Sequence, residues 1–295
     1  MKTKTFTQRL LGCMLLAAST LTVQAAERLL IVGDGVWGGW SIDNSIVMMN
    51  DAAQPDVFTA TVNLKAESDF KFLTEATWGG LEYRAGDASV TLSDGASAAL
   101  VSSDDNSNDN KFRVDETANY SIVCDLAAKT VTVTKAAYQD DVIKHTALWL
   151  VGSATTGGWN LGNATMILPS DDNPMVFRGT VDLLGGEMKI AVNKYTGYDQ
   201  TFYQRDAADD TKMTFGGDDN KWNIAKAGQY DVEVDVKNLT ISIKEHVASG
   251  ITNMATTANA TADYFTISGI RLSAPAKGIC IKRQGNRVVK TINRK

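Results

Sequence analysis

The sequence contains two copies of one pattern, and this internal repeat constrains the fold more than any other feature. LLIVGDGVWGGWSIDNSIVM (29–48) aligns with LWLVGSATTGGWNLGNATMI (148–167), with seven of twenty positions identical. Further along, VFTATVNL (57–64) aligns with VFRGTVDL (176–183), DFKFL (69–73) with EMKIA (187–191), and NKFRV (110–114) with NKWNI (220–224). Matches that recur in the same order predict two similar domains.

Apolar and polar residues alternate within both copies. VFTATVNL (57–64) and YDVEVDV (230–236) have a period of two, which is typical of half-buried antiparallel strands. No stretch has a sustained helical period, and clusters of Gly, Asn and Asp separate the short runs. The pattern predicts an all-β chain of two tandem Ig-like β-sandwich domains.

The ends of the repeats define the expected domain organisation. We expect a first domain at 26–136, a linker at 137–146, a second domain at 147–246 and a linker at 247–262. The C-terminal segment (263–295) reads as strand, turn and strand, with the strands at Gly278–Lys282 and Arg287–Lys290. Of the three cysteines, Cys124 reads as a small core residue, and no disulfide framework is expected.

Charge is unevenly distributed along the chain. The net charge is −5, but residues 264–295 carry eight Lys or Arg and no Asp or Glu, so the remainder sums to −13 (−5 minus +8). An acidic body lacks the basic face that nucleic-acid binding needs. We therefore expect no nucleic-acid partner.

The N-terminus has the features of a secretory signal peptide. Lys2, Lys4 and Arg9 precede an apolar stretch (10–23), and small residues at 23 and 25 form a cleavage site. We expect cleavage near residue 25 and export of the rest. The alternative is lipidation at Cys13, because the preceding residues resemble a lipobox, although most of the apolar stretch follows that cysteine.

The repeats carry no sign of a catalytic apparatus. The one obvious carboxylate shared by the aligned copies is Asp125/Asp235, which we expect to form a turn, and neither His145 nor His246 recurs. No nucleophile, metalloprotease or phosphate-loop motif is present. The acidic loops (102–110 and 216–220) lack the EF-hand spacing and are expected to be solvated. We expect no catalytic residue, no metal site and no cofactor.

Aromatic residues do recur. A Trp follows Gly-Gly in each copy, and 36–39 residues later each copy has another aromatic in a polar loop. Between them lies a strand whose central Lys should point to the outer face. Flat rings can cover the apolar C–H patches of a sugar, while a cation donates hydrogen bonds to hydroxyls. The candidate ligand-binding residues are Trp37, Trp40, Lys71, Trp78, Tyr83, Arg84, Trp159, Lys189, and Tyr195 or Tyr198.

Packing roles compete with binding for several of these residues. Trp40 and Trp159 are equally well explained as caps on a core, and the two lysines as ordinary solvated strand residues. Trp37 has Thr156 as its counterpart, so packing and binding are both open for it. Trp149 and Trp222 replace Leu30 and Phe112, which indicates strand packing for both.

Both repeats resemble the SusE/SusF family of outer-membrane starch-binding proteins. The resemblance rests on LxxVGxxxxGGW, the Asn that follows it, the VFxxTVxL strand and the (F/M)K(F/I) strand. The resemblance covers about residues 28–245. It implies non-catalytic β-sandwich carbohydrate-binding modules at the cell surface, which hold α-glucan on aromatic residues with Lys or Arg. At matching positions stand Trp40, Lys71 and Trp78 in the first copy, and Trp159, Lys189 and Tyr195 or Tyr198 in the second.

The C-terminal segment has a resemblance of its own. ISGIRL (267–272) and KGICIKRQGNRVVK (277–290) look like a C-terminal type IX secretion sorting domain, with Cys280 where such domains usually have Tyr. The combined expectation is a cell-surface or secreted polysaccharide-binding protein. Its partners would be an α-glucan and the outer-membrane secretion or glycan-uptake machinery. The alternative is a structural or adhesive surface protein whose modules do not bind sugar.

Overall fold

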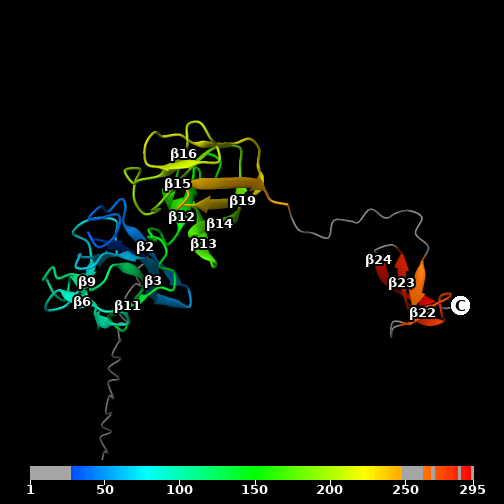
Figure 1. Cartoon of the computed structure of the whole chain (residues 1–295), viewed down its shortest axis with the longest axis horizontal. Helices are drawn as coiled ribbons and strands as arrows, with labels where there is room; N and C mark the ends of the chain where they lie inside the picture. Colours follow the sequence, from blue (N-terminus) through cyan, green and yellow to red (C-terminus); the bar gives the residue numbers. More distant parts are fainter. Residues whose placement is uncertain (1–27, 248–261, 267–269, 285–286, 294–295) are drawn as a thin grey trace, which may run out of the picture. The chain divides into compact units, whose positions relative to one another are not determined.

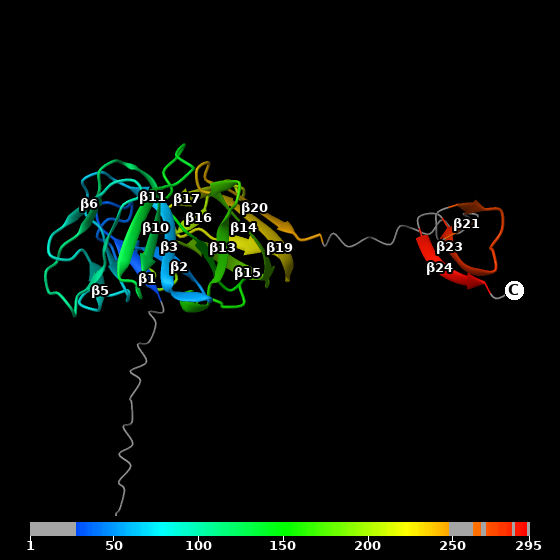
Figure 2. The same cartoon turned by 90° about the horizontal axis from the view of Figure 1, so that it is seen from below.

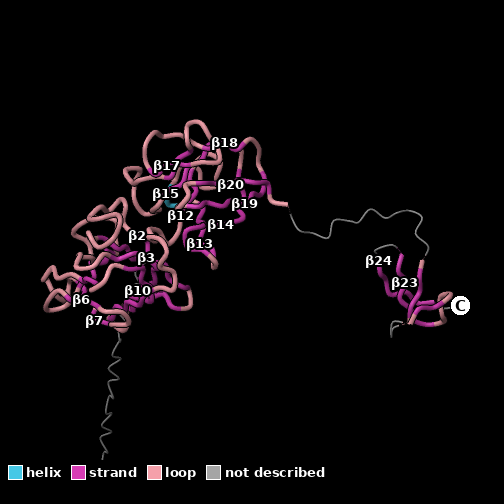
Figure 3. Tube along the Cα trace, in the orientation of Figure 1, coloured by secondary structure: helices cyan, strands magenta, loops and turns pink. Residues whose placement is uncertain are grey.

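The computed structural model describes residues 28–247, 262–266, 270–284 and 287–293. The chain divides into two compact units, with the boundary between Glu245 and His246. Regular structure in the described residues is almost entirely strand (Figure 3), with one short 3-10 helix, η1 (Leu161–Asn163). The all-β class predicted from the sequence is confirmed. The expected signal peptide lies outside the described residues.

The first repeat forms a sheet in the order β7-β11-β10-β3-β2-β1-β4-β5-β8, and β6 pairs in parallel with β9 beside it (Figure 1). The sheet path turns back on itself, so that its two halves enclose the core. The strands are β1 (Leu29–Val32), β2 (Ile46–Asp51), β3 (Gln54–Leu64), β4 (Lys71–Leu73), β5 (Glu82–Arg84), β6 (Val90–Leu92), β7 (Ser97–Ala99), β8 (Val101–Ser102), β9 (Phe112–Val114), β10 (Ala118–Asp125) and β11 (Thr130–Lys135).

The second repeat has the order β17-β16-β15-β12-β13-β14-β19-β20, with β18 paired to β15. Its inner strands β15-β12-β13-β14-β19 follow the same order as β4-β1-β2-β3-β10 of the first repeat. The strands are β12 (Leu148–Val151), β13 (Thr165–Ser170), β14 (Asn173–Leu183), β15 (Gly186–Ala191), β16 (Tyr203–Arg205), β17 (Met213–Phe215), β18 (Trp222–Ile224), β19 (Gly228–Asp235) and β20 (Thr240–Glu245).

The alternating sequences form the longest strand pairs. β3 pairs with β10 from Ala118↔Leu64 to Asp125↔Val57, and the two strands lie side by side in Figure 2. β14 pairs with β19 in the same way. Because successive side chains point to opposite faces, one apolar row of each strand enters the core and the polar row faces water.

Each repeat has its own core. In the first, Phe58, Phe70, Phe72 and Phe112 are fully buried. Cys124 is buried among them, as predicted, and burial raises the pKa of its thiol. In the second, Phe177, Met188, Ile190 and Trp222 are among the buried residues, which confirms the packing role predicted for that Trp.

A third apolar cluster joins the two repeats. It contains Leu30 and Val32 of β1 together with Trp149 and Val151 of β12, all of them buried. These are equivalent positions in the two copies, so each repeat buries the outer face of its first strand against the other. β1 and β12 are therefore buried on both faces rather than half-buried. Trp149 is a packing residue, as predicted.

The segment between the repeats (137–146) is tied into this arrangement. Ile143 and His145 are buried, and the Ile143 carbonyl accepts a hydrogen bond from the Asn63 backbone at 2.8 Å. The buried Asn119 amide donates to the carbonyls of Tyr138 and Asp141 at 2.9 and 2.7 Å. Because so many of its polar groups are bonded, this segment fixes the repeats to each other.

The C-terminal unit is a separate four-stranded sheet with the order β22-β21-β23-β24. Its strands are β21 (Asp263–Phe265), β22 (Arg271–Leu272), β23 (Gly278–Gln284) and β24 (Arg287–Asn293). β23 and β24 form the predicted strand pair, from Gly278↔Asn293 to Gln284↔Arg287. Cys280 is buried within this unit.

Within the described ranges, none of the helices has the length and apolar character that crossing a bilayer requires.

His145 provides a pH-dependent contribution to stability. Its Nε2 lies 3.0 Å from the Tyr203 hydroxyl, and its ring packs edge-on against Trp37 of the first repeat and Phe215 of the second. Burial, together with the charge of Lys144, lowers the pKa of His145 to about 3. Below the unfolded-state value of about 6.5, the unfolded chain therefore binds a proton that the folded chain excludes.

We expect the free energy of unfolding to fall as the pH drops from 6.5 toward 3. The contribution from His145 at pH 5 is about 2 kcal/mol. Urea titrations at pH 7.5 and 5.0 measure it. In a His145→Phe variant, which keeps an aromatic ring, the difference between the two pH values should shrink by about that amount; an unchanged difference would contradict the assignment.

Candidate functional site

The Gly-Gly-Trp loop of the first repeat is explained by two steric requirements. A Cβ on Gly38 would lie 2.2 Å from the Asn44 carbonyl oxygen, so no side chain fits there. Gly39 has φ +61°, a left-handed conformation that favours glycine. The tight turn that results presents Trp40 at the surface, where it is 40% exposed.

The second repeat builds the same loop. A Cβ on Gly157 would lie 2.2 Å from the Asn163 carbonyl oxygen, and Gly158 has φ +58°. Trp159 is 39% exposed. The shared glycines and asparagine of the motif are therefore conformational, and what they position in each copy is an exposed indole.

A second exposed ring lies beside the first in repeat 1. Trp78, in the loop between β4 and β5, is 48% exposed. Its ring centroid is 6.5 Å from that of Trp40, and the two planes are inclined at 44°. The Nζ of Lys71 lies 5.5 Å from the Trp78 ring centroid and that of Lys111 lies 5.7 Å from the Trp40 centroid. Each indole therefore has a cation against it.

An ion-pair cluster lies beside this aromatic pair. Lys71 Nζ is 2.6 Å from a Glu82 oxygen and 3.2 Å from Asp109, and Asp109 also pairs with Arg84 at 3.3 Å and Lys111 at 2.7 Å. Partial burial acts to raise the pKa of Asp109, but hydrogen bonds from Lys111 and Lys71 lower it to about 2. Asp109 is thus a carboxylate at all physiological pH values.

The second repeat has the equivalent aromatic pair. Tyr198 is 46% exposed, and its hydroxyl donates a 2.5 Å hydrogen bond to the backbone carbonyl of Trp159. Lys189 Nζ lies 5.1 Å from the Tyr198 ring centroid, and Lys221 Nζ lies 5.9 Å from the Trp159 centroid. Tyr198 also stacks on Phe202, with 5.6 Å between the centroids.

Asp219 occupies the place that Asp109 has in the first repeat. It accepts from Lys221 at 2.9 Å and from Lys189 at 3.0 Å. The hydrogen bond from Lys221, with a further one from Lys189, lowers the pKa of Asp219. Both repeats therefore present two exposed rings, two lysines and one shared carboxylate.

The two strand lysines are less accessible than the sequence suggested. They do lie on the face opposite the core, but Lys71 and Lys189 are only 6% and 7% exposed. The expectation that they are solvated is wrong. The aromatic rings and the carboxylates of Asp109 and Asp219 cover them, an arrangement that strand periodicity cannot reveal.

Three candidates lie away from the aromatic pairs. Trp37 is part of the packing between the repeats, where it contacts both cores and His145. Tyr83 pairs with Phe72 and faces the core of the first repeat. Tyr195 packs against the apolar cluster between the repeats, so Tyr198 is the partner of Trp159. The fourth candidate, Arg84, is buried and belongs to the ion-pair cluster beside Trp40 and Trp78, where it pairs with Asp109.

The sequence analysis missed the second shared carboxylate. Asp109 and Asp219 precede the aligned NKFRV and NKWNI segments, so Lys111 and Lys221 also match. Both aspartates lie in the acidic loops (102–110 and 216–220) that the sequence predicts to be solvated, one residue before the aligned segments. Asp125, the carboxylate that was noted, accepts a hydrogen bond from the Ala128 backbone and has the predicted turn role.

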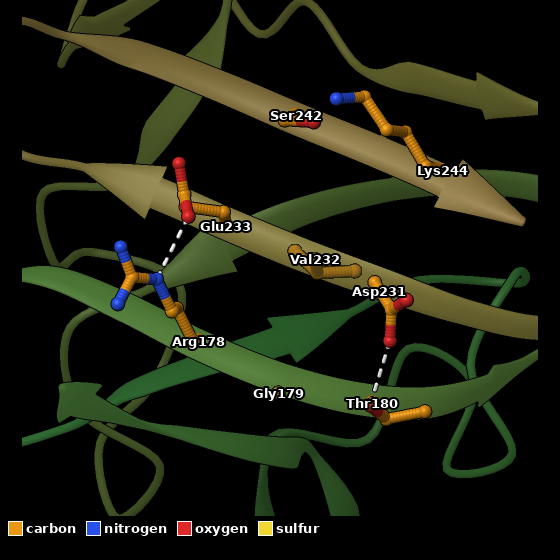
Figure 4. A pocket seen from close by; sticks show the side chains of 8 residues that line it. All are labelled: Arg178, Gly179, Thr180, Asp231, Val232, Glu233, Ser242 and Lys244. Carbon is orange, nitrogen blue, oxygen red and sulfur yellow. Dashed lines mark hydrogen bonds and ion pairs between the residues drawn. The ribbon is translucent and has the colours of Figure 1, made fainter. Parts of the chain in front are cut away.

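A different hollow lies on the outer face of β14, β19 and β20 (Figure 4). Its walls are polar: Arg178 bonds to Glu233 at 2.7 Å, and the Thr180 hydroxyl bonds to Asp231 at 2.7 Å. No aromatic ring lines it. Since its charged side chains bond across the strands, it lacks the flat apolar surface that both aromatic pairs offer.

In the part of the chain that the structure describes, no three His, Cys, Asp or Glu side chains gather closely enough to hold a metal ion. The acidic loop once considered for calcium ends in Asp109, whose carboxylate is engaged by three cations.

Comparison with known proteins identifies the second repeat. Residues 147–242 match the profile of a family described as SusF/SusE starch specific CBMs, where CBM stands for carbohydrate-binding module. The second repeat is therefore similar to the modules of this family. The resemblance noted in the sequence is thereby confirmed for the second repeat. The matched range contains Trp159, Lys189, Tyr198 and Asp219.

Among solved structures, SusF from Bacteroides thetaiotaomicron is similar over 88% of this chain and 58% of its own, with 14% identity and a TM-score of 0.31. The chain thus spans less than two thirds of SusF. No curated protein matches the chain significantly.

Substitutions at the two glycines of the Gly-Gly-Trp loop should destabilise the protein to different extents. Gly38→Ala should lower the free energy of unfolding by about 1–3 kcal/mol, because the new Cβ collides with backbone. Gly39→Asn should cost about 1 kcal/mol or less, since Asn tolerates positive φ and the space around Gly39 is open. Urea denaturation measures both variants, and equal losses would contradict this expectation.

The shared carboxylate should matter for stability as well. Asp109→Asn removes the negative charge between three cations, and we expect a loss of about 1 kcal/mol. Asp105→Asn is the matched control, because that residue lies in the same loop and pairs with Lys129 alone among charged groups. The control should leave the unfolding midpoint unchanged. An Asp109→Asn midpoint equal to the control's would show that the cluster contributes nothing to stability.

Proposed function

We propose that this chain is a non-catalytic polysaccharide-binding protein that holds starch-like α-glucan at two aromatic pairs, Trp40–Trp78 and Trp159–Tyr198. One observation carries the proposal: both repeats expose two rings beside a lysine–aspartate cluster. The starch specificity described for the family of the second repeat supports the choice of ligand. The first repeat shares the loop, the rings and the charged groups.

The two kinds of group suit a sugar. The ring faces can cover the apolar C–H surface of a glucose unit, and polar atoms at their edge can bond its hydroxyls. The most accessible polar side chains at the pairs are Asp109 and Asp219, whose side chains are 57% and 60% exposed. Their oxygens can accept from sugar hydroxyls, while Lys111 and Lys221 at the rim donate.

The expected affinity is modest. If half of a ring's ~200 Å² is covered, at ~25 cal/mol/Å² each ring contributes about 2.5 kcal/mol. Two rings give about 5 kcal/mol before ordering costs, which corresponds to a dissociation constant of roughly 0.1–1 mM per site. Such a value suits capture of an abundant polymer.

The electrostatics of the pairs supports binding without catalysis. A general acid needs a pKa near the working pH, whereas the cations beside Asp109 hold its pKa at about 2. Asp219 is lowered in the same way by its two lysines. In both pairs the neighbouring cations favour the ionised carboxylate, which accepts hydrogen bonds.

The place of action is part of the same proposal. An N-terminal segment with signal-peptide features and the surface location of SusE/SusF proteins support an exported protein, at the outer membrane or released. The C-terminal unit (263–295) would serve sorting by an outer-membrane secretion system. Partners would include that system or glycan-uptake machinery.

A structural or adhesive surface protein is the competing function. Buried rings would favour it, because a sugar can only stack on ring faces that are open to water. Four rings that are 39–48% exposed favour sugar binding instead.

Affinity electrophoresis in gels containing starch, pullulan, dextran or xylan tests the proposal. We expect starch and pullulan to retard the protein. Trp78→Ala and Tyr198→Ala should each reduce the retardation, and the double variant should migrate as in a gel without polysaccharide. Each substitution removes one ring and weakens its site roughly tenfold or more.

Met166→Ala is the control, since it removes an exposed apolar side chain that belongs to neither aromatic pair. It should be retarded like the original chain. Unretarded migration of the original chain in every gel would rule out binding of those glycans and favour the adhesive function.

A further inference from the structure

The two aromatic pairs rest on one common base. Each exposed ring stands in a loop, and a residue within four positions of it belongs to the apolar cluster between the repeats. These residues are Ile42 for Trp40, Ala76 for Trp78, Leu161 for Trp159 and Phe202 for Tyr198. Close packing makes such a cluster resistant to deformation, so the loops cannot move independently of it.

Hydrogen bonds also connect one pair's loop to the other's. The segment that follows Trp40 (41–45) bonds to the segment that contains Tyr198 (193–201) at several points. The bonds are Asn193 Nδ2 to Ser45 Oγ at 2.9 Å, Thr196 Oγ1 to the Asp43 carbonyl at 3.3 Å, and the Thr201 backbone N–H to Asn44 Oδ1 at 2.8 Å. Asn193 and Ser45 are buried, so water does not compete for that bond.

These contacts limit the distance between the sites. Trp40 is three residues from Asp43, and Tyr198 is two residues from Thr196. With consecutive Cα atoms about 3.8 Å apart, the Cα atoms of Trp40 and Tyr198 are separated by about 27 Å at most. A chain of several sugar units is long enough to cover even this largest possible separation.

We propose that the two aromatic pairs form one composite site and that a single α-glucan chain spans both. The inference rests on the proposed function and adds a preference for chain length. Two weak sites held at a fixed separation present the second to an already bound chain at millimolar effective concentration. Because each site has an expected dissociation constant of roughly 0.1–1 mM, bridging should tighten binding by up to about tenfold.

The test compares a short and a long ligand by isothermal titration calorimetry. Maltotriose should bind weakly, with two molecules per protein. A linear amylose fraction long enough to reach both pairs should bind more tightly, with one amylose chain per protein when the glucan is in excess. Trp78→Ala and Tyr198→Ala should each reduce the maltotriose stoichiometry to one.

The decisive control is an equimolar mixture of those two single variants. It offers both kinds of intact pair, but on separate protein molecules, so bridging within one molecule is impossible. It also cancels the statistical advantage that a long chain has from its many overlapping binding positions. We expect the original chain to bind amylose several-fold, up to about tenfold, more tightly than the mixture does, while maltotriose affinities are the same.

Equal amylose affinities for the original chain and the mixture would overturn the composite site and leave sugar binding at each pair intact. Absence of binding to both maltotriose and amylose would overturn the proposed function and the composite site together.

Discussion

The burial of two outward-facing strand surfaces against each other determines how this chain is organised. A β-sandwich needs only one apolar face per sheet, yet β1 and β12 carry apolar side chains on both. Leu30 and Trp149 occupy equivalent positions and meet in the cluster between the repeats. Because exposing this apolar surface to water is unfavourable, the repeats form one compact unit instead of two independent domains joined by a linker. The loops with the exposed rings are built on that junction.

Charge near the rings follows a second constraint. A lysine that is covered by an aromatic ring must keep its ammonium group paired, since an isolated buried charge is very unfavourable. Lys71 and Lys189 meet this requirement with Asp109 and Asp219, which are also held by Lys111 and Lys221. The arrangement supports the rings from beneath and leaves carboxylate oxygens exposed beside them. In the proposed function, the side chains that pair the buried lysines would also bond the hydroxyl groups of the sugar.

Much of the fold could be predicted because its signals are local. Alternation in VFTATVNL and YDVEVDV identified central strands. Gly38 and Gly39 marked a turn, in which Gly38 is required by close contact with Asn44 and Gly39 is favoured by its positive φ. The site was harder to predict. Polar loops pointed to Trp78 and to Tyr195 or Tyr198, whereas the sequence left packing and binding both open for Trp37. Its partners, His145 and Phe215, come from distant parts of the chain. The pairing of Asp109 with Lys71 joins residues 38 positions apart.

The sequence by itself determined the two repeats, their central strands, the turns that present Trp40 and Trp159, and the strand pair at 278–293. Each of these depends on periodicity or on residues a few positions apart. Only the tertiary structure decided which aromatic ring lies beside each exposed Trp. It also decided that the lysines are covered and that the repeats share an apolar junction. Those features arise where strands from separate segments come together, and the energy of packing them is not encoded in any single stretch of the chain.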